Sequence, residues 1–161
     1  MKAVMLSIRP KWVEKIASGE KTVEVRKTAP KLEVPFKVYM YCTYGNEREN
    51  YCLGKRGKVV GEFVCDKISE APTSFISPET VNIAIGARMR EKDLCEYGKG
   101  KNIYGWHISD LKIYDKPKDI TDFGKIKVIR EGTMWFGNRY ECNHIFKEPI
   151  TRPPQSWCYV E

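Results

Sequence analysis

The hydrophobic pattern of the first 26 residues predicts a strand followed by a helix. Residues 3–8 form a continuous apolar run with the length of a buried strand. Pro10 is favoured in a first helical turn, and apolar residues follow it at helical spacing, namely Trp12, Val13, Ile16 and Ala17. Gly19 is expected to end this helix, because glycine adopts the left-handed conformation without steric cost.

A second strand is predicted after Gly19, where apolar and polar residues alternate. Residues 22–26 read Thr-Val-Glu-Val-Arg, so the two valines share one face and the polar residues share the other. Lys21 lies at the edge of this polar face, near Glu24 and Arg26. We therefore expect an acid and two bases on a face that is open to solvent.

The remaining pattern predicts further strands and a helical region. The strands are expected at 36–42, 58–68, 103–114 and 156–160. Ser77 is expected to cap one or two helices over 78–97, with a break near Gly86. The segment Lys116-Pro117-Lys118 is expected to end the strand that begins at residue 103, because proline has no N–H group to donate to a strand ladder.

Residues 119–150 are interpreted as an insertion in an otherwise regular pattern. They contain short alternating segments around 126–129 and 134–136, with turns expected at Gly132 and Gly137. Elsewhere strands outnumber helices and lie near both ends of the chain. We therefore predict a single domain over 1–161 of the α+β class. Its strands are expected to form a small, mostly antiparallel β-barrel with a few surrounding helices.

Composition narrows the class of protein. Hydrophobic residues make up 42% of the 161 residues and charged residues 30%, which excludes a disordered chain. No apolar run approaches the roughly 20 residues that cross a bilayer, and no secretion signal is evident at the N-terminus. Six scattered cysteines without a Cys-x-x-Cys pair indicate reduced thiols in the cytoplasm. The net charge of +7 favours a polyanionic partner, although a merely soluble basic surface has the same charge.

Several motifs together point to a known family. The spaced set Gly19-x-Lys21-x-x-Glu24-x-Arg26 follows the segment Leu6-Ser7-Ile8-Arg9-Pro10 and Trp12. Further matching segments lie at 59–63, 103–108 and 152–157. This pattern resembles the ASCH domain of the PUA-like superfamily over nearly the whole chain, apart from residues 119–150. The resemblance implies a pseudo-barrel of strands with helices on one side and a cleft beside the first helix.

The resemblance also implies a range of functions. PUA-like relatives bind RNA or modified nucleobases, some small relatives are amidohydrolases that remove an acyl group from acetylated cytidine, and others are ribonucleases. The amidohydrolase relatives carry a nucleophilic threonine three residues after the lysine. Glu24 stands at that position here, three residues after Lys21, which argues against the acyl-removing mechanism.

The polar face has chemistry that suits an anionic ligand. Arg26 could hold a phosphate through two hydrogen bonds, Lys21 offers a point charge, and Glu24 could accept from an exocyclic amino group. If the protein is a hydrolase, Glu24 would be the general base and Lys21 would stabilise an oxyanion. The simpler alternative is a surface ion pair between Glu24 and Arg26.

Other basic residues extend the candidate binding surface. Arg9 could reach the same cleft, whereas Trp12 is expected in the core because it shares a helical stripe with apolar residues. Lys55, Arg56 and Lys58 form a basic loop near two tyrosines, Tyr44 and Tyr51. Such a loop can hold backbone phosphates and stack a base, or it can be a solvated turn. Lys99 and Lys101 are weaker candidates of the same kind.

Two further groups favour a structural interpretation. His107, Ser109 and Asp110 have the composition of a triad, but a structural histidine is the preferred interpretation. Cys142 and His144 could supply two zinc ligands where a structural site needs four, so we expect neither a metal nor a cofactor.

The sequence thus favours an RNA-binding or nucleotide-binding domain with a cleft around Lys21, Glu24 and Arg26. Its expected partner is RNA or a modified nucleoside or nucleotide, and not a membrane. The alternatives are a small hydrolase acting on acylated nucleosides or RNA, and a protein-interaction module.

Overall fold

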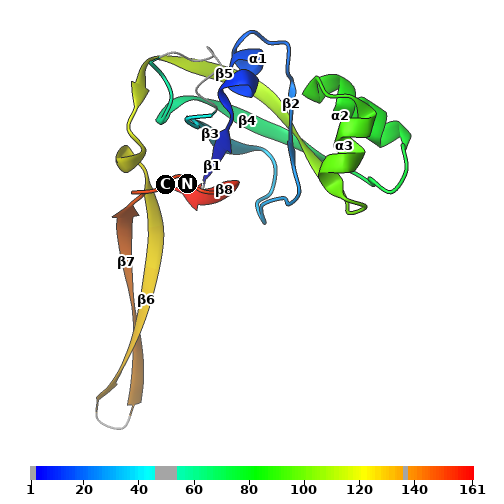
Figure 1. Ribbon diagram of the computed structural model, residues 1–161. Coiled ribbons are helices and arrows are strands. Elements are labelled where there is room, and N and C mark those ends of the chain that lie inside the picture. The colour runs from blue at the N-terminus through cyan, green and yellow to red at the C-terminus, as the bar shows by residue number, and fades with distance from the viewer. Residues whose placement is uncertain (1–2, 46–53, 136–137) are drawn as a thin grey trace.

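The computed structural model describes residues 3–45, 54–135 and 138–161, with side chains described throughout these ranges except at 126–146. The strands are β1 (Ala3–Ile8), β2 (Val23–Arg26), β3 (Phe36–Cys42), β4 (Lys58–Ala71), β5 (Ile103–Lys118), β6 (Gly124–Trp135), β7 (Asn138–Pro149) and β8 (Trp157–Val160). The helices are α1 (Pro10–Ala17), α2 (Pro78–Ala87), α3 (Glu91–Gly98) and the short 3-10 helix η1 (Ile120–Asp122). The predicted mixture of strands and helices is confirmed (Figure 1).

Six strands form one sheet in the order β2-β5-β4-β3-β1-β8. The β1–β3 pair is parallel and the other pairs are antiparallel, so the sheet is mostly antiparallel as predicted. The two ends of the sheet approach each other through side chains: Arg26 on β2 donates hydrogen bonds to Ser7 on β1 and to Ser156 just before β8. The described pairings do not include a ladder between β2 and β8, so the closed barrel stays a prediction.

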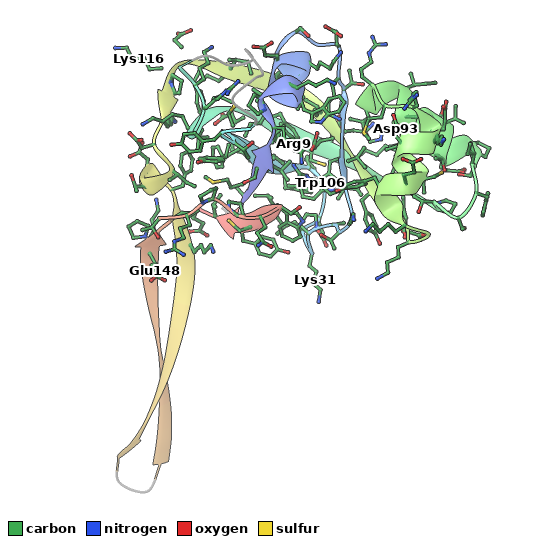
Figure 2. All side chains as sticks on the ribbon, in the orientation of Figure 1. Arg9, Lys31, Asp93, Trp106, Lys116 and Glu148 are labelled. Atoms are coloured by element: carbon green, nitrogen blue, oxygen red, sulfur yellow. The ribbon has the colours of Figure 1, made fainter. Side chains whose placement is uncertain are left out.

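The strand β1 is buried along its whole length, because it carries apolar side chains on both faces. One face of the sheet packs beneath α1, whose buried residues include Val13 and Ile16. Trp106 of β5 is fully buried in this same core, near the middle of the body in Figure 2. A separate cluster joins the valines of β2 to α2 and α3, so β2 is also covered on both faces.

The helical region begins at Ser77, as predicted. The Ser77 hydroxyl accepts a hydrogen bond from the Thr80 amide at 3.2 Å, and the Thr80 hydroxyl accepts one from the Ser77 amide at 3.3 Å. The helix continues through Gly86 and ends at Ala87, and Arg88 then takes a left-handed conformation with φ of 55°. Within the described ranges, no helix combines the length and apolar character needed to cross a membrane.

The strand β5 ends at Lys118, within the segment Lys116-Pro117-Lys118 that is predicted to end it, although the strand passes through Pro117. The strand runs on to Lys118, which pairs with Val59. Between this pair and the Gly61–Ile113 pair the register shifts, and β2 covers β5 only from residue 104 to 107. Pro117 therefore lies in an irregular stretch with one uncovered edge, where its missing N–H group costs no ladder bond.

The strands β6 and β7, residues 124–135 and 138–149, form a two-stranded ribbon that projects from the rest of the protein (Figure 1). Gly132 pairs with Glu141 inside this ribbon, so the turn predicted at Gly132 is wrong, whereas the turn predicted at Gly137 lies outside the described residues. The base of the ribbon is anchored in the body: Phe123 and Ile150 are buried in one cluster, and the Ile150 amide donates to the Phe123 carbonyl at 2.9 Å. In the described part of the chain, β6 and β7 pair with each other and with no strand of the six-stranded sheet.

Candidate functional site

A cavity of about 460 Å³ lies beside α1. Its lining comes from α1, β1, β2, the α2–α3 region and the segment before β8, and comprises Ser7, Ile8, Arg9, Trp12, Lys21, Glu24, Val25, Arg26, Thr43, Met89, Tyr97 and Gln155. Four of the residues predicted from sequence, Arg9, Lys21, Glu24 and Arg26, are thus brought to one cavity. Their role in ligand binding stays a prediction.

Lys21, Glu24 and Arg26 converge on one another at the floor of this cavity. The Glu24 carboxylate lies 3.3 Å from the Lys21 ammonium through one oxygen and 2.9 Å from the Arg26 guanidinium through the other. Their exposed fractions are only 3%, 6% and 9%, respectively. The expectation of a solvent-open face is therefore wrong. The ion pair between Glu24 and Arg26 does form, but it is buried and not at the surface. This face is covered by Trp12 of α1, by β1 at Ser7 and by the segment before β8 at Ser156.

The local fold explains why these residues meet. Glu24 and Arg26 alternate along β2 and share a face, while Val23 and Val25 pack toward α2 and α3. Gly19 has φ of 77°, which confirms the left-handed helix stop. The amide of Lys21 then donates to a carbonyl of α1 and the next amide donates to a carbonyl of α2, at 2.9 and 2.8 Å. The start of β2 is thereby fixed between two helices.

The Lys21 ammonium is fully engaged within the protein. Besides contacting Glu24, it donates to the carbonyl oxygen of Ala87 at 3.2 Å and lies 5.0 Å from the ring centroid of Trp12. Burial lowers the pKa of Lys21 below its ordinary value, and the nearby Glu24 carboxylate opposes this shift.

Arg26 connects the site to the fold. Its Nη2 atom donates to the Ser7 carbonyl at 2.8 Å and also contacts Glu24, while its Nη1 atom lies 3.4 Å from the Ser156 hydroxyl. Its Nε atom is buried and has no hydrogen-bond partner among the described residues. Arg26 is therefore largely committed to holding β2 against β1 and to neutralising Glu24.

The walls of the cavity are aromatic and half-buried. Trp12 packs against the core, as predicted, but it also lines the cavity, which its helical stripe did not indicate. Tyr97 of α3 and Met89 line it as well, and neither was identified from the sequence. Burial raises the pKa of Tyr97. Tyr97 is more than 70 residues from Lys21 in the chain, so no local motif could have linked the two.

The rim of the cavity is exposed. Arg9 follows β1 directly and precedes α1, as Figure 2 shows, and its side chain is exposed although it lines the cavity. Gln155, in the segment before β8, is likewise exposed. Within the described ranges, Arg9 makes no side-chain hydrogen bond or ion pair.

The predicted basic loop lies apart from the cavity lining. Lys55 and Arg56 occupy a turn and Lys58 begins β4, where it forms an ion pair with Asp119. Tyr44 packs over this turn. Its hydroxyl oxygen lies so near Gly57 that a Cβ atom added there would be only 2.5 Å away. The second flanking tyrosine, residue 51, is outside the described residues. Binding of nucleic acid by this loop, and by the lysines at 99 and 101, stays a prediction.

The remaining candidates have other partners. The Nε2 atom of His107 lies 2.8 Å from the Ser69 hydroxyl, and Ser109 donates to the Val64 carbonyl, so neither bond forms a triad with Asp110. Burial lowers the pKa of His107. The described side chains include no group of three or more potential metal ligands, and the side chains of Cys142 and His144 are outside them.

Comparisons with known proteins agree with this architecture. A family model described as the ASCH domain matches residues 6–117. The crystal structure of ASCH from Zymomonas mobilis is similar to this chain, with a TM-score of 0.63 and 16% identity over 99% of this chain and 87% of that one. A serine-to-alanine mutant of that protein gives a TM-score of 0.63 at 15% identity, covering 99% of this chain and 88% of the mutant. At such identities the likeness to solved structures shows the fold alone. A search of curated proteins finds no match.

Proposed function

The chain belongs to the ASCH domain family, and from this premise we propose that it binds RNA or a nucleotide in the cavity beside α1. The observation that carries the proposal is the buried group of Lys21, Glu24 and Arg26 at the cavity floor. Burying three charges carries a desolvation cost even when they are paired, so their presence beside an open cavity supports a binding role.

The floor has the polar groups that recognise a nucleobase. Each oxygen of Glu24 accepts from one cation, which leaves lone pairs that can accept from an exocyclic amino group of a base. The aromatic side chains of Trp12 and Tyr97 supply flat apolar walls.

Binding measurements across salt concentrations test the proposal. Single-stranded and structured RNA should both be titrated, because the net charge of +7 predicts electrostatic attraction to either one. A set of phosphate contacts should make the affinity fall steeply as ionic strength rises. Absence of binding to RNA and to mononucleotides at low salt would overturn the proposal. It would leave a protein-interaction module as the better explanation.

A second candidate is hydrolysis of an acylated nucleoside. The lowered pKa of Lys21 favours it, since a buried lysine can act as a base or stabilise an oxyanion. The engagement of Lys21 with Glu24 and Ala87 counts against it, as does the missing threonine. Incubation with acetylated cytidine decides between the two. Release of cytidine that Lys21→Met abolishes would establish an enzyme, whereas no turnover would leave the binding proposal standing.

A further inference from the structure

The cations of the cavity fall into two classes, which differ in exposure and in partners. Lys21 and Arg26 are buried at the floor and are both bound to Glu24. Each also donates to a main-chain carbonyl, that of Ala87 or that of Ser7. Arg9 is exposed at the rim and has no ionic partner among the described residues. Among the described residues, the cavity cation without a bonding partner is therefore Arg9, at the mouth.

The floor disfavours a phosphate. Glu24 is held between the two floor cations, so a phosphate that reached them would also meet a carboxylate. Like charges at close range repel, and more strongly where water is excluded. Two cations and one carboxylate leave a single net positive charge, which is spread over groups that already have partners. The floor thus suits a neutral polar group better than an anion.

We infer that the cavity takes one nucleotide with its base inward and its phosphate outward at Arg9. This inference rests on the proposed function and assigns an orientation to the ligand. It reverses the sequence-based hypothesis, in which Arg26 holds the phosphate. The base meets Glu24, and the half-buried aromatic walls flank it.

The size of the cavity limits the ligand to about one nucleotide. Its volume of about 460 Å³ is within the range of cavities that bind small molecules, roughly 300–1,000 Å³. A polynucleotide strand could enter such a site only with a single nucleotide turned out of its stack. The exposed Gln155 lies at the same rim as Arg9, so the sugar and the neighbouring backbone would leave the cavity there.

A cycle of ligands and variants tests the orientation. The four ribonucleosides and their 5′-monophosphates are titrated against the wild type, Arg9→Ala and Lys11→Ala. Lys11 is the matched control, because it is an exposed cation two residues away that does not line the cavity. Arg9→Ala should fold normally, because the Arg9 side chain is exposed and makes no described bond.

The measured quantity is the gain in affinity that the phosphate provides. In the wild type we expect a monophosphate to bind about tenfold or more tightly than its nucleoside, as for a hydrogen bond to a charged group. Arg9→Ala should abolish that gain without weakening nucleoside binding, and Lys11→Ala should preserve it. A gain that persists in Arg9→Ala, or that both variants lose equally, would overturn the inference.

The same experiment separates this inference from the proposed function. If the wild type binds RNA with a steep salt dependence but binds no nucleoside or monophosphate, the proposed function stands and the single-nucleotide orientation is wrong. If the wild type binds neither RNA nor any mononucleotide, the proposed function itself fails and the orientation fails with it.

Discussion

The Nη2 atom of Arg26 on β2 lies 2.8 Å from the backbone carbonyl oxygen of Ser7 on β1 and donates a hydrogen bond to it. In the order of the sheet, β2 is at one end and β1 is next to the other end. The Arg26 side chain therefore links two strands that are not paired with each other, at the floor of the cavity. The same guanidinium holds Glu24, so the stability of the fold and the arrangement of the site depend on one residue.

Replacing Arg26 should cost considerable stability. Removing one partner of a buried ion pair typically costs about 3–5 kcal/mol, and Glu24 keeps its contact with Lys21, so we expect about 3 kcal/mol for Arg26→Ala. Urea denaturation measures this loss. The control is Arg90→Ala, which removes an exposed pair with Asp93 and should cost about 0–1 kcal/mol. Equal effects of the two changes would contradict the role assigned to Arg26.

Gly86→Ala should destabilise the protein, although helix propensity alone favours alanine. Gly86 lies within α2, and a Cβ atom there would be 2.5 Å from the Cγ2 atom of Val23. Valine is stiff and buried at that point, so α2 would have to move away from β2, at a cost of about 1–3 kcal/mol. Thermal denaturation checks this. Ile85→Ala, at an exposed position of the same helix, should have little effect, and a stabilised Gly86→Ala would show that the close approach is unimportant.

Trp12→Ala should weaken ligand binding more than it weakens the fold. Trp12 is half-buried against the cavity, and contact between an aromatic side chain and a base contributes about 1–3 kcal/mol. RNA affinity should therefore fall by roughly 5- to 100-fold, with the salt dependence unchanged because no phosphate contact is lost. If Trp12→Ala binds RNA as tightly as the wild type, the base does not contact Trp12. Trp12→Phe should retain most of the affinity.

Stability at alkaline pH should depend on Cys65. Burial raises the pKa of the Cys65 thiol to about 12, above its ordinary value of 9.0. The unfolded chain releases this proton first, so the thiol's contribution is fully present below pH 9 and decreases from about pH 9 to pH 12. Between pH 8 and pH 10.5 the wild type should lose about 1–2 kcal/mol more of its free energy of unfolding than Cys65→Val does. Parallel urea titrations of the two proteins give this difference, and identical pH profiles would contradict the prediction.

Removing the projecting ribbon should leave the body intact. A variant that joins Gly124 to Pro149 through a short glycine-serine turn keeps the buried anchors Phe123 and Ile150. Because β6 and β7 pair only with each other, we expect the melting temperature and nucleotide affinity of the body to be little changed. Calorimetry and titration of the shortened chain check this. Loss of folding would show that the ribbon is part of the core.

The parts of the fold that were predictable rest on short-range signals. The strand, helix and second strand of the first 26 residues follow from local periodicity and from Gly19, whose φ of 77° requires no distant contact. The cap at Ser77 is similarly local, since its partner Thr80 is three residues away. The spacing of Glu24 and Arg26 along a strand was enough to predict that they share a face.

The features that sequence reasoning missed depend on distant packing. The partner of the buried Lys21 ammonium is the carbonyl oxygen of Ala87 at the end of α2, which lies 66 residues away in the chain. Tyr97 reaches the cavity only because α3 packs beside β2. Neither position has a local pattern that distinguishes it from an ordinary helical residue. Alternation along a strand likewise does not reveal that the Arg26 guanidinium already bonds Ser7 and Glu24.

The mutual bonding of the floor residues has a consequence for the kinetics of recognition. Ion pairs join Glu24 to Lys21 and to Arg26, and each cation also donates to a main-chain carbonyl. These groups therefore have their positions in the absence of a ligand. Binding to a preorganised site of this kind causes little loss of conformational entropy. Capture should then be limited by diffusion and orientation rather than by rearrangement, so that variants at the floor change residence time more than the rate of encounter.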